Sequence, residues 1–137
     1  MSNTARFRTQ HAELVKQSDY LLACLDDAAI DAKTLRVALN ILAGKISLHL
    51  AMEDDVLYPR MRAHPDKSLG QLATRFGDEM AGLKSAFLAY NALWGVQKIE
   101  GDRAGFVKET RAVLSALGTR IQRENTELYA RFDAAAG

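Results

Sequence analysis

The chain contains one cysteine and two prolines among its 137 residues. A single cysteine, Cys24, excludes an internal disulfide, and its position among leucines indicates a buried, inert thiol. Two prolines leave long stretches without the residue that most often interrupts a helix. The low cysteine and proline content therefore favours a helical protein of a reducing compartment, and we expect the cytoplasm.

An excess of charge of one sign is also missing. Lysine and arginine number 18 against 17 aspartates and glutamates, and the basic residues are scattered along the chain. This balance gives no support for a surface that binds nucleic acid or a membrane. The sequence shows no signal-peptide core at its N-terminus and no apolar run that approaches a membrane span. We expect one domain over residues 1–137, with no nucleic-acid or membrane partner.

Apolar residues recur at three- and four-residue steps, and the alternation typical of strands is missing. This spacing predicts helices over about 4–28, 32–62, 66–97 and 102–133. Pro59 is expected to kink or end the second helix. Because the connections between the helices are short and polar, neighbouring helices should run antiparallel. The predicted fold is all-α, an up-down-up-down four-helix bundle.

One segment of the chain occurs twice, the second copy 71 residues after the first. The first copy contains His49, Glu53, Leu57, Tyr58 and Arg60, and the second contains Arg120, Glu124, Leu128, Tyr129 and Arg131. Four residues make about one helical turn, so the first and second members of each copy share a helix face. A His-x-x-x-Glu pair facing a bundle interior is a metal-ligand arrangement, whereas Arg-x-x-x-Glu is not.

Ionisable residues interrupt the apolar seams of three predicted helices. They are His11, His49, Glu53, Arg120 and Glu124. A single histidine at such a position is more often a core residue with its hydrogen bonds made inside the protein than a metal ligand. A single glutamate there more often faces solvent. Their occurrence together at compatible depths predicts a polar cluster inside the bundle. A buried carboxylate without a partner costs several kcal/mol, so either a bound cation or the arginine must compensate the glutamates.

On these residues the chain resembles a hemerythrin-like domain of the HHE cation-binding family. The resemblance follows the order of His11, the stretch 49–59 ending in Leu-Tyr-Pro, and the altered second copy from Arg120. It implies a four-helix fold with a di-iron site that serves dioxygen binding, iron handling, or redox and nitric oxide sensing. Carried over by position, His11 and His49 would be the terminal ligands of one metal. The carboxylates of Glu53 and Glu124 would bridge the pair.

Two positions depart from the family pattern. The third helix has Met80 after Glu79 where a histidine is usual, and the second copy begins with Arg120 instead of histidine. Both losses fall on the same metal, so one site keeps four ligands and the other loses both histidines. Because a guanidinium pairs well with carboxylates, we hypothesise that Arg120 occupies the place of the missing metal and neutralises Glu53 and Glu124. Either the four retained residues hold one iron, manganese or zinc ion, or no metal binds.

The sequence favours a metal-free or single-metal sensory or regulatory module. The alternative is a functional iron-binding protein for dioxygen, redox or nitric oxide sensing or iron handling. An enzyme is not expected, because one histidine pair without a second metal serves two-electron dioxygen chemistry badly. Expected partners are a metal ion, dioxygen or nitric oxide, and an unidentified protein. The chain is expected to be a monomer or a homodimer, with Trp94 and Val96 as candidate exposed interface residues.

Overall fold

The computed structural model describes residues 3–135, and this part of the chain is helical and contains no strand. The long helices are α1 (Ala5–Leu25), α2 (Ala32–Met52), α4 (Lys67–Leu93) and α6 (Arg103–Arg123). Shorter segments are α3 (Tyr58–Ala63), α5 (Val96–Gly101), α7 (Ala130–Ala135) and the π-helical turns η1 (Glu53–Leu57) and η2 (Glu124–Tyr129). The all-α prediction is confirmed, although the chain is divided into more segments than the four expected.

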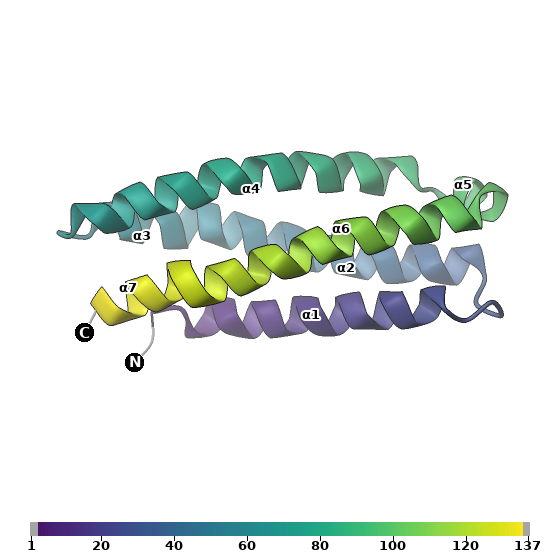
Figure 1. Ribbon diagram of the computed structural model, residues 1–137, viewed down its shortest axis with the longest axis horizontal. Coiled ribbons are helices and arrows are strands. Elements are labelled where there is room, and N and C mark those ends of the chain that lie inside the picture. Colours follow the sequence, from purple (N-terminus) through teal and green to yellow (C-terminus); the bar gives the residue numbers. More distant parts are fainter. Residues whose placement is uncertain (1–2, 136–137) are drawn as a thin grey trace.

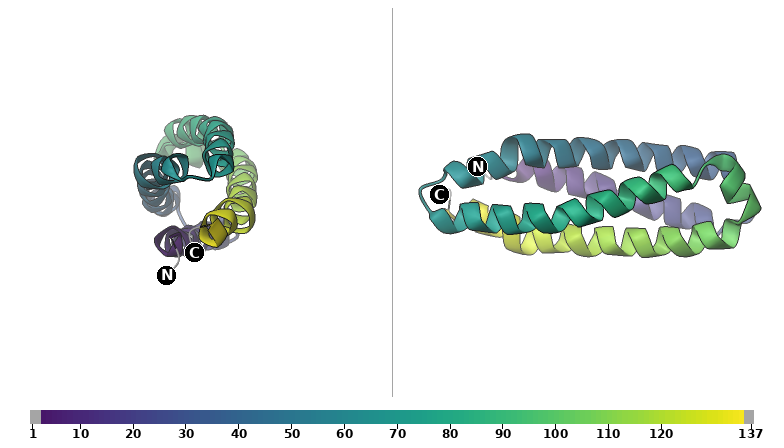
Figure 2. Two further views of the ribbon diagram at one scale, coloured as in Figure 1. Left: turned by 90° about the vertical axis from the view of Figure 1, so that its left-hand side faces the viewer. Right: turned by 90° about the horizontal axis from the view of Figure 1, so that it is seen from above.

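The long helices lie alongside one another and give the molecule an elongated shape (Figure 1). Viewed along the long axis, they surround a common interior, with α2 between α1 and α4 and with α6 on the opposite side (Figure 2). The start of α1 and the end of α7 lie at the same end of the molecule (Figure 1). Side chains from all four long helices therefore have access to one shared core.

Aspartates fix the starts of three long helices. The carboxylate of Asp31 accepts a hydrogen bond from the backbone N–H of Thr34 at the start of α2. Asp66 and Asp102 make the corresponding contacts at the starts of α4 and α6. A side-chain oxygen at this position satisfies an N–H that the helix itself leaves without a partner. Each polar break in the sequence thus ends in the residue that starts the next helix.

Pro59 does not end the second predicted helix. It is the second residue of α3, directly after the π-helical turn η1, and the helical path continues to Ala63. The widened turn absorbs the local distortion, with the Tyr58 N–H bonded to the Glu53 carbonyl. The second copy of the repeat is π-helical as well, at η2, and it has no proline. Proline alone is therefore not the reason for the π turn.

The apolar core forms two clusters. The larger one includes Leu21, Leu39, Leu42, Phe106 and Cys24, whose thiol is free and buried as the sequence predicts. The smaller one is formed by Phe7, Leu57, Tyr58, Met61, Leu69, Leu72, Ala73, Phe76, Leu128, Tyr129 and Phe132. The suggested interface residues are not exposed: Trp94 is buried, and Val96 packs against the larger cluster.

One helical stretch is long and apolar enough to cross a membrane by length and composition. It covers Ala32–Ala63, with a mean hydropathy of 1.3 over its most apolar window, 39% of which is buried in the bundle. Its inner face supplies core residues such as Leu39 and Leu42, and core helices of soluble proteins pass the same test. The expectation that no run approaches a membrane span is therefore too strong for this helix.

Candidate metal centre

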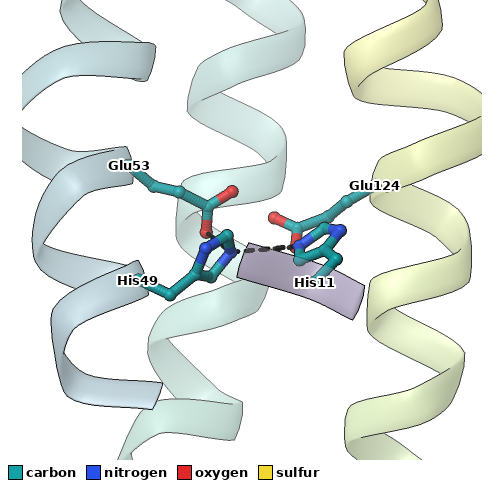
Figure 3. A group of neighbouring side chains, drawn as sticks. All are labelled: His11, His49, Glu53 and Glu124. Atoms are coloured by element: carbon teal, nitrogen blue, oxygen red, sulfur yellow. Dashed lines mark hydrogen bonds and ion pairs between the residues drawn. The ribbon is translucent and has the colours of Figure 1, made fainter. Parts of the chain in front are cut away.

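Two histidines and two glutamates meet between the two apolar clusters. One ligand atom from each of His11, His49, Glu53 and Glu124 lies within 4.8 Å of the others, and all four side chains are buried. We call these residues the His/Glu cluster. Figure 3 shows the two imidazoles facing each other, with a carboxylate beside each. The structure therefore brings together the four ligand positions predicted from the sequence.

Each member of the cluster occupies a defined place on its element. His11 lies on the buried face of α1, and His49 lies in the last turn of α2. Glu53 and Glu124 are the first residues of the π-helical turns η1 and η2. The repeat seen in the sequence is thus a repeat in backbone shape, and each copy begins its wide turn at the glutamate. Such turns are frequent at functional sites.

The ligand atoms are close enough to share one ion. The Nε2 atom of His11 lies 3.0 Å from Nε2 of His49 and 3.0 Å from Oε1 of Glu124. His49 Nε2 lies 3.3 Å from Glu53 Oε1 and 4.0 Å from Glu124 Oε1. Two imidazoles and two carboxylates form a donor set suited to iron, manganese or zinc.

Amide oxygens orient both imidazoles. The Nδ1 atom of His11 is 2.8 Å from Oδ1 of Asn125, and Nδ1 of His49 is 2.7 Å from Oε1 of Gln10. An amide oxygen only accepts, so each Nδ1 carries a proton and donates it. In the neutral form this leaves the Nε2 lone pair of each ring directed at the cluster. Metal-binding histidines are oriented in this way.

This arrangement places two basic nitrogens in direct contact. With both Nδ1 protons committed, the Nε2 atoms of His11 and His49 would each present a lone pair across 3.0 Å. Two lone pairs repel, so the contact requires a proton on one nitrogen or a cation between them. The geometry therefore demands positive charge at the centre of the cluster.

When no metal is bound, a proton on one of the cluster side chains supplies this positive charge. Burial opposes protonation of His49, but contacts with Glu124 and Glu53 outweigh burial and raise its pKa to about 9. Burial disfavours the Glu124 carboxylate, but hydrogen bonds from His11 and His49 lower its pKa to about 2. Burial, opposed by His49, raises the pKa of Glu53 to about 7. At neutral pH a His49 imidazolium thus neutralises the Glu124 carboxylate.

Tyr129 joins the cluster from η2. Its hydroxyl donates to Glu53 Oε2 at 2.8 Å and lies 3.1 Å from His11 Nε2, while its ring stacks on the His11 ring. Buried Oε1 of Glu53 and Oε2 of Glu124 have no hydrogen-bond partner within residues 3–135. Carboxylate oxygens left in this state, beside two inward Nε2 atoms, fit a metal ion.

The hypothesis that Arg120 neutralises the cluster glutamates is wrong. Its guanidinium donates to Glu79 Oε2 at 2.8 Å and to the Phe76 carbonyl, and it lies 4.5 Å over the Phe76 ring. Glu79 is partly exposed, so pairing with it requires less desolvation than pairing with a fully buried carboxylate. Arg120 also lowers the pKa of Glu79. In a metal-free cluster, the raised pKa of His49 makes its imidazolium the compensating cation.

Met80 is buried, and it lies near two members of the His/Glu cluster. It lines a small, mostly apolar cavity of about 20 Å³ that also reaches His49 and Glu124. A thioether is a soft ligand, poorly matched to iron, manganese or zinc. The cavity has room for about one molecule the size of water. Apolar space therefore lies next to the ligand atoms of the His/Glu cluster.

Sequence reasoning missed the residues that surround the cluster. Gln10 and Asn125 are only partly buried, so they fall outside the apolar seams that revealed the ligands. The sequence gives one indication of their role: Gln10 directly precedes His11, and Asn125 directly follows Glu124. Nothing in the sequence identifies Glu79 as the partner of Arg120, because that choice depends on how α4 and α6 are rotated against each other.

The chain matches the family model described as Hemerythrin HHE cation binding domain over residues 2–132. This range holds all four members of the His/Glu cluster, together with Met80 and Arg120. Comparison with curated proteins gave no match, and comparison with solved structures gave none.

Proposed function

Because the chain belongs to the hemerythrin HHE cation-binding family, we propose that it is a single-metal sensory or regulatory module. One iron, manganese or zinc ion is held by the His/Glu cluster. The observation that carries this proposal is the convergence of four buried ligand atoms within 4.8 Å of one another, with both Nδ1 atoms bonded to amide oxygens. Iron is the metal that the family resemblance favours.

In this proposal the side chains around the metal orient its ligands and exclude water from the site. Asn125 and Gln10 hold the imidazoles in the tautomer that ligates, and Tyr129 donates to Glu53. The bound ion supplies a Lewis-acidic centre and, as iron or manganese, a redox-active one. The apolar side chains above and below the cluster exclude water from it. We assign the metal site a role in sensing or regulation, in which it binds a signal molecule and does not convert a substrate.

The small cavity beside the cluster supports a diatomic signal such as dioxygen or nitric oxide. Its lining is almost entirely apolar, including Leu14, Ile46, Met80 and Ile121, and it ends at His49 and Glu124. A volume of about 20 Å³ admits a molecule of a few atoms and excludes larger metabolites. The buried Cys24 thiol agrees with a cytoplasmic location, which we include in the proposal.

Metal analysis tests the proposal directly. Protein purified after expression in medium supplemented with iron, manganese and zinc is expected to contain one metal ion per chain. His49→Ala should lose that ion, because it removes a ligand from the centre of the cluster. His64→Ala is the matched control, since His64 lies outside the cluster and accepts a backbone hydrogen bond from Asp66. Helical content measured by circular dichroism must be unchanged in both variants.

A metal-free module is the second candidate. The observation in its favour is the proximity of His49 to Glu53 and Glu124, which raise its pKa to about 9 and so favour an imidazolium that needs no metal ion. Absence of metal from the wild-type protein under all three loading conditions would establish this candidate and reject the first. Two ions per chain would reject both, because Met80 and Arg120 would then not have abolished the second site.

The amides that orient the histidines provide a further prediction. Asn125→Ala is expected to weaken Zn²⁺ binding about tenfold, because partners of this kind contribute ten- to a hundredfold to metal affinity. Gln10→Ala should have a similar effect through His49. Competition with a coloured chelator measures both affinities. Gln122→Ala, an exposed change on α6, is the control, and equal affinity for all variants would contradict the orienting role.

A further inference from the structure

Helix α2 has a second apolar face, which points away from the bundle. Exposed residues follow one another on this face at alternating steps of three and four. They are Thr34, Val37, Ile41, Gly44, Leu48, Ala51 and, in η1, Asp55. We call them the outer stripe. The exposed fractions of Val37, Ile41 and Leu48 are 50%, 45% and 61%. Steps of three and four are the spacing of a seam between paired helices.

The bundle does not cover this face. The most apolar window of Ala32–Ala63 is buried over only 39% of its extent. In the end-on view the outer side of α2 has no helix against it (Figure 2). A surface helix normally carries charged and polar residues opposite its core face. The outer stripe departs from that pattern and has the composition of a face that packs against a partner.

We propose that the outer stripe is a homodimer interface, in which the α2 helices of two copies pair antiparallel across a two-fold axis at Gly44. The stripe is symmetric about this residue to within one position: Val37 lies seven positions before it and Ala51 seven after it. An antiparallel copy therefore sets Val37 against the partner's Ala51. It also brings Ile41, three positions before Gly44, close to the partner's Leu48, which lies four positions after Gly44.

A lysine beside the first residue of the stripe and the aspartate that ends it select this arrangement. Lys33 lies eleven positions before Gly44, and Asp55 lies eleven positions after it; both are exposed. In an antiparallel pair each lysine faces the partner's aspartate. Because both copies use the same surface, this contact occurs twice, once at each end of the interface. A parallel pair would set lysine against lysine and aspartate against aspartate. This self-complementarity identifies a second copy of the chain as the occupant of the stripe.

The centre of the stripe allows close approach. A side chain added at Gly44 would meet no atom within 4 Å, so the α2 backbone is open to a neighbour at this point. Helix axes approach most closely where the side chains at the contact are small. Gly118 on α6 is equally open, but it is flanked by exposed Ser115 and Gln122, and no apolar stripe surrounds it.

A groove runs beside the stripe between α2 and α4. It has a volume of about 160 Å³, and its lining includes Ser47, Ala51 and the exposed Leu88. An apolar side chain of the partner's stripe has a place in this groove once the two helices are in contact. The interface therefore extends from one helix face onto the neighbouring helix, which increases the area buried on each copy.

The mass of the wild-type protein in solution tests the proposal. Light scattering over a concentration series is expected to give twice the chain mass of 15.1 kDa. Leu48→Glu should raise the dissociation constant of the dimer at least about tenfold, because it places a charge at the centre of the interface. Val15→Glu is the control: Val15 is 42% exposed, and it lies on α1 outside the stripe. It should leave the mass unchanged.

A charge exchange tests the orientation of the two helices. Lys33→Glu alone and Asp55→Lys alone should each weaken the dimer, since each sets like charges against one another. The double variant should restore it. A double variant as weak as either single one would overturn the antiparallel arrangement.

Three further results would overturn the interface itself. One is a mass of 15.1 kDa throughout the concentration series. Another is a dimer whose dissociation constant Leu48→Glu does not change. The third is a monomer that co-sediments with phosphatidylcholine vesicles through the stripe, which would assign the face to a membrane instead.

Discussion

Raising the pH of the metal-free protein from 6.5 to about 9 is expected to lower its free energy of unfolding by on the order of 3 kcal/mol. The cause is His49, whose pKa is raised on folding by Glu124 and Glu53 against the effect of burial. Between those pH values the folded chain binds more protons than the unfolded one. The stabilisation is therefore fully present below pH 6.5 and is lost as the pH rises through 9.

The two glutamates shape the acidic side of the same profile. Glu53, whose pKa rises from 4.5 to about 7, adds a loss of stability as the pH increases through that range. Glu124, with its pKa lowered to about 2, contributes stability above pH 4.5 that is lost as the pH falls through 2. Urea unfolding of chelator-treated protein at a series of pH values measures the profile. His49→Gln should remove the alkaline slope, and an unchanged slope in that variant would contradict the assignment.

Metal uptake at pH 7 is expected to release between one and two protons per ion, and metal affinity should rise about a hundredfold from pH 7 to pH 9. An ion must displace the His49 proton, whose pKa is about 9, and the proton carried by Glu53 in part of the population. Each pH unit below the pKa of His49 lowers the affinity about tenfold. Above pH 9 the dependence should level off.

Calorimetric titration in buffers of different ionisation enthalpy counts the released protons, and chelator competition gives the affinity at each pH. His64→Ala, whose substituted histidine lies outside the cluster, should release the same number as the wild type. A pH-independent affinity would mean that the ion binds elsewhere, because an ion at the His/Glu cluster must displace the His49 proton.

The helices were predictable from the sequence because the bundle is built on regular apolar spacing, but their ends were not. The third predicted helix runs to about residue 97, whereas α4 ends at Leu93 and α5 begins at Val96. A long-range contact accompanies this break: the guanidinium of Arg36 on α2 donates to the carbonyls of Asn91 and Trp94. These carbonyls then have partners that do not depend on continuing the helix.

The candidate site was predictable to the extent that it follows helical periodicity. Spacing placed His49 and Glu53 on one face, and the repeated segment placed Glu124 at the same depth. The partner of Arg120 was not predictable, because Glu53, Glu124 and Glu79 all lie within one or two turns of its level. Only the packed arrangement shows that Arg120 contacts α4. The π turns were equally hidden, since nothing in the amino-acid composition of η2 distinguishes it from an α-helix.

The division of the apolar core has a consequence for cohesion along the bundle. The smaller hydrophobic cluster lies at the end of the molecule where α1 begins and α7 ends, and the layer of ionisable side chains separates it from the larger one. Apolar attraction alone does not bridge that layer. The continuous helices and the contacts of Arg120 with Phe76 also join this end to the rest of the protein. A change of what occupies the His/Glu cluster therefore alters how readily the end frays, without being the sole connection.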